Sequence, residues 1–328
     1  MKWGLSAKSP PPREVHVGRY EILSLVGVGG MAEVFRARAH GPGGYQRELI
    51  IKRILPHFAQ NPAFIRAFVE EAKILGMLSH PNIVGVYDFG EDAGRHYLAL
   101  EYLDGLSLAE MLSRRRRAQA PIPIGVVAFI VREVALGLSA VHTLQLPNGD
   151  SLNVIHRDVT PSNIMTTRAG GVKLLDFGIA KSLIGETFTR RGEIKGKAGY
   201  LAPEQVRGEV IDARVDLFAL GIVLYELLTL EPLFQGEGGE IAAAYRVMEM
   251  PIAPPSQQRS DVPPALDAIA MRALVRERDG RFPTARDMSD ALDLVIRESG
   301  VRREEVRQFI AACEAMGELR GAAPDSAT

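Results

Sequence analysis

Cysteine is almost absent from this sequence, because the 328 residues include only Cys313. A single thiol cannot close a disulfide within the chain, so no such bond holds the fold and a reducing compartment is favoured. Neither sign of charge is in excess, since 39 lysines and arginines face 40 aspartates and glutamates. The sequence therefore has no chain-wide attraction to nucleic acid or to an anionic membrane, and any partner must be recognised locally.

Long apolar segments are lacking as well. Residues 1–15 have no apolar core of the kind found in a signal peptide. The longest apolar run, from Leu217 to Leu230, contains Glu226 and is shorter than the roughly 20 residues that cross a bilayer. These absences predict a cytoplasmic protein with no membrane span, in which residues 217–230 form a helix buried in protein.

A hydrophobic share of 46% is enough to bury a large core, and the length favours two lobes. Residues 1–16 are polar and rich in proline, which predicts a disordered segment. Residues 17–103 show β-type runs around one helix, and residues 104–297 are mainly helical. Residues 298–328 predict an amphipathic helix followed by a disordered tail. This helix either packs on the helical part or binds something else.

A glycine cluster, "GVGGMAEV" from Gly27 to Val34, joins the first two long β-type runs. Because glycine has no Cβ, backbone N–H groups in such a loop can approach phosphate oxygens closely. A plain hairpin produces the same pattern, so both interpretations stay open for this stretch alone. The cluster also departs from G-x-G-x-x-G, since Ala32 stands at the position of the third glycine.

Two charged residues lie where apolar ones are expected. Lys52 ends the β-type run "ELIIK", and its ammonium would be costly to bury without an anion. Glu71 continues the helical spacing of Phe64 and Phe68, which places its carboxylate on the apolar face of the predicted helix. Lys52 and Glu71 either pair with each other or lie at the edge of the core, with the lysine reaching water.

Three further motifs complete the pattern. Asp158 and Asn163 stand five residues apart in "IHRDVTPSN", Asp176 follows a β-type run in "LLDFG", and "GYLAPE" ends at Glu204. In this order, the motifs resemble those of eukaryotic-like bacterial serine/threonine protein kinases over about residues 17–297. The resemblance implies an α+β, bilobal protein-kinase fold, with a small β-rich N-lobe that carries one regulatory helix and a larger α-helical C-lobe.

The resemblance also implies a role for each of these residues. Lys52 would hold the α- and β-phosphates of ATP and pair with Glu71. Asp158 would accept the proton of the substrate hydroxyl, and Asn163 and Asp176 would bind Mg²⁺. The crowded charges of a triphosphate require an ammonium and divalent cations, and these cations prefer hard oxygen ligands. ATP and Mg²⁺ are thus expected at the site, and proteins with Ser or Thr hydroxyls are the expected acceptors.

The residues that match the nucleotide site lie in the glycine loop and around the adenine position. Leu100 matches the gatekeeper, and the backbones of Glu101 and Leu103 would meet adenine. Ile50 stands where the family usually has alanine, which predicts a tighter adenine slot. The full expected set is Val26, Gly27, Val28, Gly29, Gly30, Met31, Ala32, Glu33, Val34, Ile50, Lys52, Leu100, Glu101, Leu103 and Met165.

Structural and regulatory residues of the family are matched too. Asp216 matches the family's aspartate that holds the catalytic loop in place. Arg281 and Glu204 match an arginine and a glutamate that form an ion pair in the family. Arg157 would clamp a phosphate on the activation loop, because such a phosphate brings negative charge to an arginine that lacks a partner. The candidate sites of autophosphorylation are Thr187 and Thr189.

Two departures from the family pattern belong together. Thr160 replaces the lysine that Ser/Thr kinases carry two residues after the catalytic aspartate, and Lys197 replaces a threonine of the activation segment. In the family these two positions meet in the active site. We expect an exchange, in which Lys197 supplies the charge and Thr160 the hydroxyl. The alternative is that both residues changed in a nucleotide-binding pseudokinase scaffold.

The sequence therefore predicts an ATP- and magnesium-dependent Ser/Thr protein kinase that acts in signalling, under the control of a regulatory protein partner. The basic run "SRRRRAQA", residues 113–120, predicts a solvated helix face. A docking site for an acidic partner is the alternative for this run.

Overall fold

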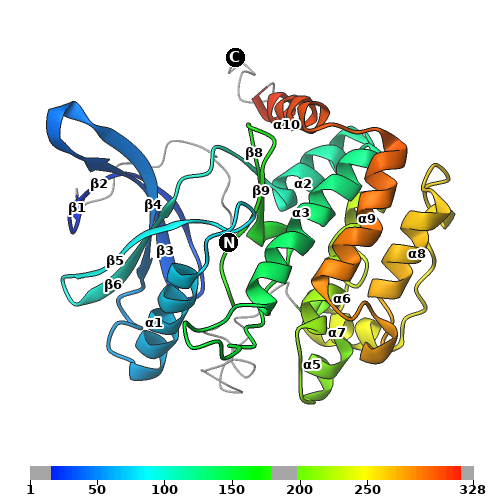
Figure 1. The fold of residues 1–328 in the computed structure, drawn as a ribbon, viewed down its shortest axis with the longest axis horizontal. Helices are drawn as coiled ribbons and strands as arrows, with labels where there is room; N and C mark the ends of the chain where they lie inside the picture. The colour runs from blue at the N-terminus through cyan, green and yellow to red at the C-terminus, as the bar shows by residue number, and fades with distance from the viewer. Residues whose placement is uncertain (1–15, 179–197, 319–328) are drawn as a thin grey trace, which may run out of the picture. The chain divides into compact units, whose positions relative to one another are not determined.

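The computed structural model describes residues 16–178 and 198–318 (Figure 1). The described residues form two compact units, of which the first holds residues 16–103 and 175–178. The second unit holds residues 104–174 and 198–318. Of the segments predicted to be disordered, residues 1–15 and the C-terminal tail lie outside the described residues, and His16 is described.

The first unit is built on a six-stranded antiparallel sheet with the strand order β1-β2-β3-β4-β6-β5 (Figure 1). Its long strands carry the β-branched and aromatic residues that suit a half-buried pleated surface. The register places Val34 opposite Lys52, and Ile50 opposite Leu100. The strands are β1 (His16–Val17), β2 (Tyr20–Val28), β3 (Ala32–His40), β4 (Gln46–Ile54), β5 (Val86–Asp92) and β6 (Arg95–Glu101).

One α-helix, α1 (Pro62–Met77), accompanies this sheet and contacts β5 and β6. The Asn61 side chain caps it by accepting a hydrogen bond from the Ala63 backbone N–H at 3.0 Å, and Pro62 takes the first helical position. The buried face of α1 includes Phe64 and Glu71. Asn61 and Pro62 are the residue types that favour a helix start at these two positions, and the predicted burial of the Glu71 carboxylate is confirmed.

The second unit is mainly helical, with a three-stranded sheet in the order β7-β8-β9. These strands are β7 (Gly105–Ser107), β8 (Ile164–Thr167) and β9 (Val172–Leu174). The helices are α2 (Leu108–Ala118), α3 (Ile124–His142), α5 (Pro203–Arg207), α6 (Arg214–Thr229), α7 (Gly239–Glu249), α8 (Pro264–Ala273), α9 (Ala285–Ser299) and α10 (Arg303–Glu318). The predicted α+β class, β-rich first and helical afterwards, is confirmed.

Helices α3 and α6 form the centre of the second unit. Every residue of α6 from Val215 to Leu228 is buried, as predicted for this apolar run. Helix α3 packs against both α6 and α9. Among the described residues, α3 alone has the length and composition of a membrane-crossing helix, but 67% of that window is buried inside the structure. Burial in protein is the ordinary reason for such an apolar helix.

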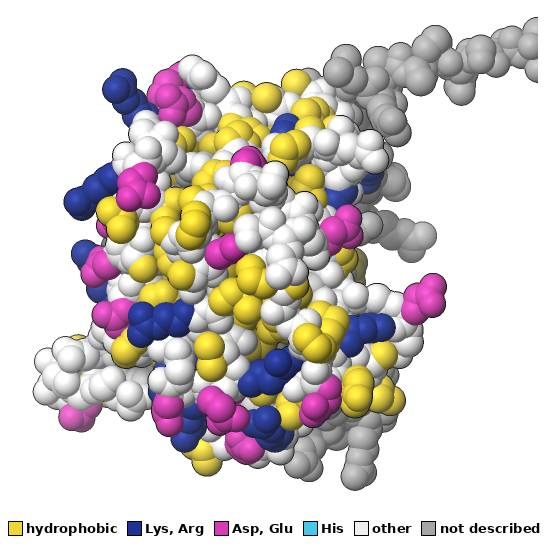
Figure 2. All heavy atoms as spheres, turned by 90° about the vertical axis from the view of Figure 1, so that its right-hand side faces the viewer, with side chains coloured by type: hydrophobic (Ala, Val, Ile, Leu, Met, Phe, Trp, Pro, Cys, Tyr) yellow, Lys and Arg dark blue, Asp and Glu magenta, His cyan; other side chains and the backbone are white. Residues whose placement is uncertain are grey.

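The outer surface of the second unit mixes its side-chain types. Figure 2 shows hydrophobic side chains interspersed with basic and acidic ones, and neither sign of charge gathers on this face. The view agrees with the formal net charge of -1. On this face, too, attraction to a polyanion has no broad electrostatic basis.

The C-terminal helix α10 belongs to the core of the second unit. Val306, Ile310 and Cys313 are fully buried in the same hydrophobic cluster as α3 and α6. From α2, Arg114 donates hydrogen bonds to the carbonyl oxygens of Cys313 and Glu314, each at 2.9 Å. Of the two alternatives for this helix, the structure shows packing on the helical part.

We predict that Ile310→Asp will lower the free energy of unfolding by about 3 kcal/mol or more, because it buries an unpaired carboxylate in this core. Thermal and urea unfolding of the full chain measure the change. Ala311→Asp, on the exposed side of the same helix, is the matched control and should have little effect. Equal stability of the two variants would show that α10 is not part of the core.

Candidate active site

The first group of predicted site residues surrounds the Lys52 ammonium, and all of it lies in the first unit. Lys52 Nζ donates a hydrogen bond to Glu71 Oε1 at 2.7 Å and to Asp176 Oδ1 at 2.9 Å. The exposed fractions of the Lys52 and Glu71 side chains are only 9% and 4%. Strand β4, helix α1 and the segment after β9 each supply one of the three charges. Of the two sequence-based alternatives, the structure shows the pair.

Electrostatics keep this lysine charged. Burial by itself lowers the pKa of the Lys52 ammonium, but the nearby carboxylates of Asp176 and Glu71 more than reverse this and raise that pKa. Asp176 has a positive φ of 41°, a backbone conformation that is uncommon outside glycine. Such backbone geometry is maintained only where the surrounding contacts require it.

The glycine cluster forms the hairpin between β2 and β3, closed by a hydrogen bond from the Gly29 N–H to the Ala32 carbonyl at 2.7 Å. Ala32, which stands at the position of the third glycine, is buried at the start of β3. Within this loop the Glu33 carboxylate is already engaged, with Arg53 and Arg95 each at 2.8 Å. Only the backbone of Glu33 is therefore suited to a nucleotide.

The remaining predicted adenine residues divide between the two units. Ile50 and Leu100 are buried on neighbouring strands of the first unit, and Met165 is buried on β8 of the second. The Glu101 side chain accepts a hydrogen bond from the Gly85 N–H at 3.1 Å. The Glu101 side chain is thus engaged, and the use of its backbone for adenine stays a prediction.

In the second unit, Asp216 organises the loop that carries Asp158. Its carboxylate accepts hydrogen bonds from the backbone N–H groups of His156 and Arg157 at 2.8 Å each, and from His142 Nε2 at 2.8 Å. Burial by itself raises the pKa of the Asp216 carboxyl, but these bonds and the histidine charges lower it overall. An ionised Asp216 thus fixes the loop backbone.

The loop itself presents three predicted residues. Asn163 donates a hydrogen bond from Nδ2 to the Asp158 carbonyl at 2.9 Å, which orients its amide and leaves the amide oxygen as the accepting atom. Thr160 is buried, and its Oγ1 has no hydrogen-bond partner among the described residues. Buried hydroxyl groups nearly always form a hydrogen bond, so we expect Thr160 Oγ1 to have a hydrogen-bond partner that is not among the described residues.

Three predicted residues, Lys197, Thr187 and Thr189, lie outside the described residues. Arg157 is described, has a positive φ of 62°, and forms no ion pair with any carboxylate in the described ranges. Burial lowers the pKa of its guanidinium, and the negative charge of Asp216 raises that pKa only in part. An arginine in this condition suits an additional anion.

Sequence reasoning missed two contacts of the site. His142 lies 74 residues before Asp216, and its position at the end of α3 gives no sign of their hydrogen bond. The pairing of Glu33 with Arg53 was also missed, although in neighbouring strands such opposite charges are a usable signal.

Comparison with known proteins decides the family. A family model described as protein kinase domain matches residues 20–315. The chain belongs to the protein kinase family.

The kinase is similar to several bacterial proteins. It is 40% identical over 281 residues to "Tyrosine-protein kinase MasK" of Myxococcus xanthus, covering 86% of this chain and 43% of that protein. It is 38% identical over 276 residues to "Serine/threonine-protein kinase PknB" of Mycolicibacterium smegmatis, covering 82% and 42%. The predicted relationship to bacterial Ser/Thr kinases is confirmed, and the kinase spans less than half the length of these relatives.

A solved structure gives the same result for the fold. The Mycobacterium tuberculosis PknI kinase domain superposes with a TM-score of 0.62 at 27% identity, covering 85% of this chain and 97% of that one. The predicted protein-kinase fold is thereby confirmed.

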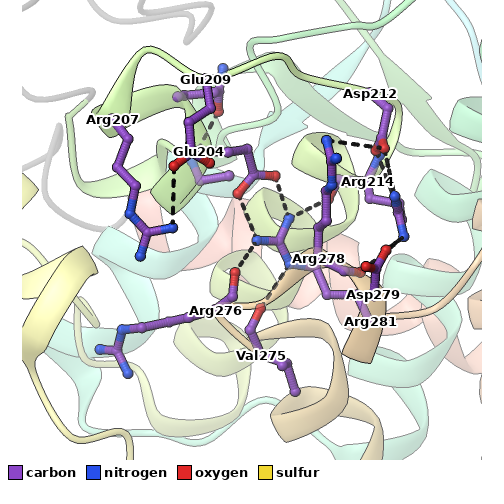
Figure 3. Close-up of polar contacts among 12 residues, drawn as sticks. Glu204, Arg207, Glu209, Asp212, Arg214, Val275, Arg276, Arg278, Asp279 and Arg281 are labelled. Carbon is purple, nitrogen blue, oxygen red and sulfur yellow. Dashed lines mark hydrogen bonds and ion pairs between the residues drawn. The ribbon is translucent and has the colours of Figure 1, made fainter.

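The kinase contains a buried ion pair between Glu204 and Arg281 in the second unit (Figure 3). Arg281 Nη1 and Nη2 donate to the two carboxylate oxygens at 2.7 and 2.8 Å. The other guanidinium N–H groups donate to the backbone carbonyls of Val275, Arg276 and Arg214. Because every partner is satisfied, this pair can remain buried, and the predicted contact is present.

We predict that Arg281→Met will destabilise the kinase by about 3–5 kcal/mol, because it leaves the Glu204 carboxylate buried without a partner. Urea unfolding near neutral pH measures the change. The control is Arg278→Met, whose side chain is 44% exposed and which should cost less than about 1 kcal/mol. A loss below that control value for Arg281→Met would contradict the assigned role.

Proposed function

We propose that this kinase transfers the γ-phosphate of ATP to serine and threonine hydroxyls of proteins. The observation that carries the proposal is the buried Lys52 ammonium, held at 2.7 Å from Glu71 and 2.9 Å from Asp176. Its charge suits the phosphates of a nucleotide, and the paired carboxylates keep it ionised in place. The family supplies ATP as the phosphate donor.

Asp158 is the proposed proton acceptor for the substrate hydroxyl. Its loop is fixed through Asp216, so the carboxylate can be presented without reorganisation when the hydroxyl arrives. The proton of the hydroxyl passes to Asp158 as its oxygen bonds to the γ-phosphorus, and ADP departs with the electrons of the broken P–O bond.

Asn163 and Asp176 are the proposed ligands of Mg²⁺. The amide oxygen of Asn163 and the carboxylate of Asp176 are the hard oxygen donors that this cation prefers. Among the described residues, no cluster of three or more His, Cys, Asp or Glu side chains offers a metal site of its own. Two protein donors are suited to a Mg²⁺ ion that arrives already bound to ATP. When bound, this cation would neutralise part of the phosphate charge.

The Thr160 hydroxyl, which has no hydrogen-bond partner among the described residues, supports the proposed exchange with Lys197. A buried threonine hydroxyl two residues after Asp158 has the chemistry of the hydroxyl that other Ser/Thr kinases place on the activation segment. Lys197 would then supply the positive charge that stabilises the transferring phosphoryl group. The catalytic loop would then supply the hydroxyl and the activation segment the positive charge, which is the reverse of the arrangement in other Ser/Thr kinases.

We further propose a cytoplasmic role in signalling, with autophosphorylation on Thr187 or Thr189 and control by a regulatory protein partner. The guanidinium of Arg157 forms no ion pair with a carboxylate in the described part of the chain, which supports the phosphosite, since a phosphate brings about -1.5 to -2 charges. Two other candidates are a pseudokinase scaffold and a tyrosine-directed kinase; the name of the Myxococcus xanthus relative favours the second.

We predict that the purified chain with labelled Mg-ATP will label itself, and that Asp158→Asn will lower this rate at least about 100-fold. Intact mass counts the phosphates, and phosphoamino-acid analysis separates Ser and Thr from Tyr. The exposed Asp150→Asn is the matched control and should keep the full rate. Binding of Mg-ATP without transfer would support the scaffold, and label on tyrosine alone would support the tyrosine kinase.

We predict that Lys197→Ala will lower kcat by about 100-fold, the effect of losing one charge-stabilising donor worth on the order of 3 kcal/mol. Combining Thr160→Lys with Lys197→Thr should restore part of the loss. Lys195→Ala, two residues away, is the control for a general loss of positive charge. An unchanged rate in Lys197→Ala would show that the exchange hypothesis is wrong.

A further inference from the structure

A buried group of charges lies on the strand that follows the glycine loop. Glu33, on β3, meets Arg53 of β4 and Arg95 of β6, which come from the next two strands of the sheet. Arg53 Nε and Arg95 Nη1 donate to the same oxygen, Glu33 Oε1, each at 2.8 Å. The side chains of Glu33, Arg53 and Arg95 are only 17%, 4% and 13% exposed. In this group of three residues, the Glu33 cluster, one carboxylate joins three strands.

The register places the Glu33 cluster on the opposite face of the sheet from the Lys52 ammonium. Glu33 lies opposite Arg53, and Val34 lies opposite Lys52. Successive side chains of a strand point to opposite faces, so the two cations on β4 point away from each other. The Arg53 guanidinium lies over the ring of Phe35, 5.3 Å from its centroid. The cluster therefore holds β3 from behind, while Val34 and Lys52 face the proposed nucleotide site.

A backbone contact fixes the same part of the glycine loop. The Leu55 N–H, just after β4, donates to the Met31 carbonyl oxygen at 3.0 Å. Before this contact the loop is open: Val28 is 59% exposed, and a Cβ at Gly30 would meet no atom of the described residues within 4 Å. The part of the loop after Gly30 is thus fixed to the end of β4, whereas the part before it has room to adjust to a ligand.

The charge of Glu33 matters to two buried cations at once. Both guanidiniums lie largely out of water, where a cation is stable only while it is paired and hydrogen-bonded. A neutral side chain at position 33 would weaken both ion pairs together. The strand after the loop would then lose its side-chain attachment to β4 and to β6.

The arginines of the basic run on α2 are used differently. Arg114 and Arg115 donate to the carbonyl oxygens of Cys313 and Ala120 at 2.9 and 2.7 Å. The sequence-based expectation of a solvated basic face is therefore wrong for Arg114 and Arg115, whereas Arg117 is exposed as expected. These contacts hold backbone, but the Glu33 cluster depends on a single carboxylate that one substitution can remove.

We propose that Glu33 is a positioning residue for the phosphates of ATP: held by Arg53 and Arg95, it fixes the glycine loop to the strand that carries Lys52. The loop N–H groups and the Lys52 ammonium are then presented to the same phosphates without reorganisation. Adenine is expected against Ile50 and the backbone after β6, so the cluster favours binding of the phosphates over binding of the base. The inference rests on the proposed function, in which ATP is the phosphate donor.

The test compares the dissociation constants of Mg-ADP and of adenosine for the full chain, measured by calorimetry. Glu33→Gln should raise Kd for Mg-ADP roughly tenfold, because the loop no longer stays where the phosphates bind. Kd for adenosine should stay within about twofold of wild type, because adenosine has no phosphate. A general distortion of the first unit would weaken both ligands alike. In the kinase assay, KM for ATP should rise and KM for myelin basic protein should not.

Further variants assign the effect to the ion pairs. Arg53→Met should give the same loss of Mg-ADP affinity, and adding Glu33→Gln should not deepen it. Glu33→Arg combined with Arg53→Glu should restore part of the affinity, because opposite charges again face each other across β3 and β4. Glu91→Gln is the matched control on β5, where the side chain is 58% exposed, and should leave both constants unchanged.

Hydrogen exchange measures the loop directly. In Glu33→Gln, the backbone amides of residues 27–34 and of Leu55 should exchange faster than in wild type. The amides of α1 should keep their wild-type rates, because that helix is held by the Lys52 ion pair. Thermal unfolding of each variant, with a midpoint well above the assay temperature, confirms that the compared proteins are folded.

The possible results separate the inference from the proposed function. An unchanged Kd for Mg-ADP in Glu33→Gln, or an equal loss for adenosine, would contradict the positioning role alone. A wild type that binds Mg-ADP but transfers no phosphate would contradict the proposed activity, and the two dissociation constants would still decide the role of Glu33. A wild type that binds no Mg-ADP would contradict both.

Discussion

The buried ammonium of Lys52 is the constraint around which the first unit is arranged. Without anions it would be costly to bury, and its two partners come from α1 and from the segment after β9. The same three charges therefore set where the helix lies on the sheet and where Asp176 is presented. The lysine proposed to bind phosphate is thus also the one whose burial requires these two carboxylates.

Helix α6 has the corresponding function in the second unit. It is buried along almost its whole length, yet it carries Asp216 and Glu226. Asp216 is surrounded by donors and remains ionised, whereas Glu226 has too few donors and titrates near neutral pH. The hydrogen bonds and the histidine charges around Asp216, and not its burial, make the difference.

Arginines hold the second unit together where disulfides are absent. Arg281 satisfies a buried glutamate and three backbone carbonyls, and Arg114 joins α2 to α10. The planar guanidinium has five donors in fixed directions, which suits it to carbonyls at element ends. The side chain of the single cysteine, Cys313, is buried in this core.

Local features of the chain were predictable from the sequence, because they depend on neighbours in the chain. The Asn61 cap, the inward face of Glu71 and the buried helix at 217–230 follow from spacing and capping rules, and resemblance to the kinase family supplied the partner of Arg281. Tertiary structure alone decided that His142 binds Asp216 and that Tyr200 and Arg116 meet at Glu226. These contacts join distant segments, and only packing of the helices determines which side chains become neighbours.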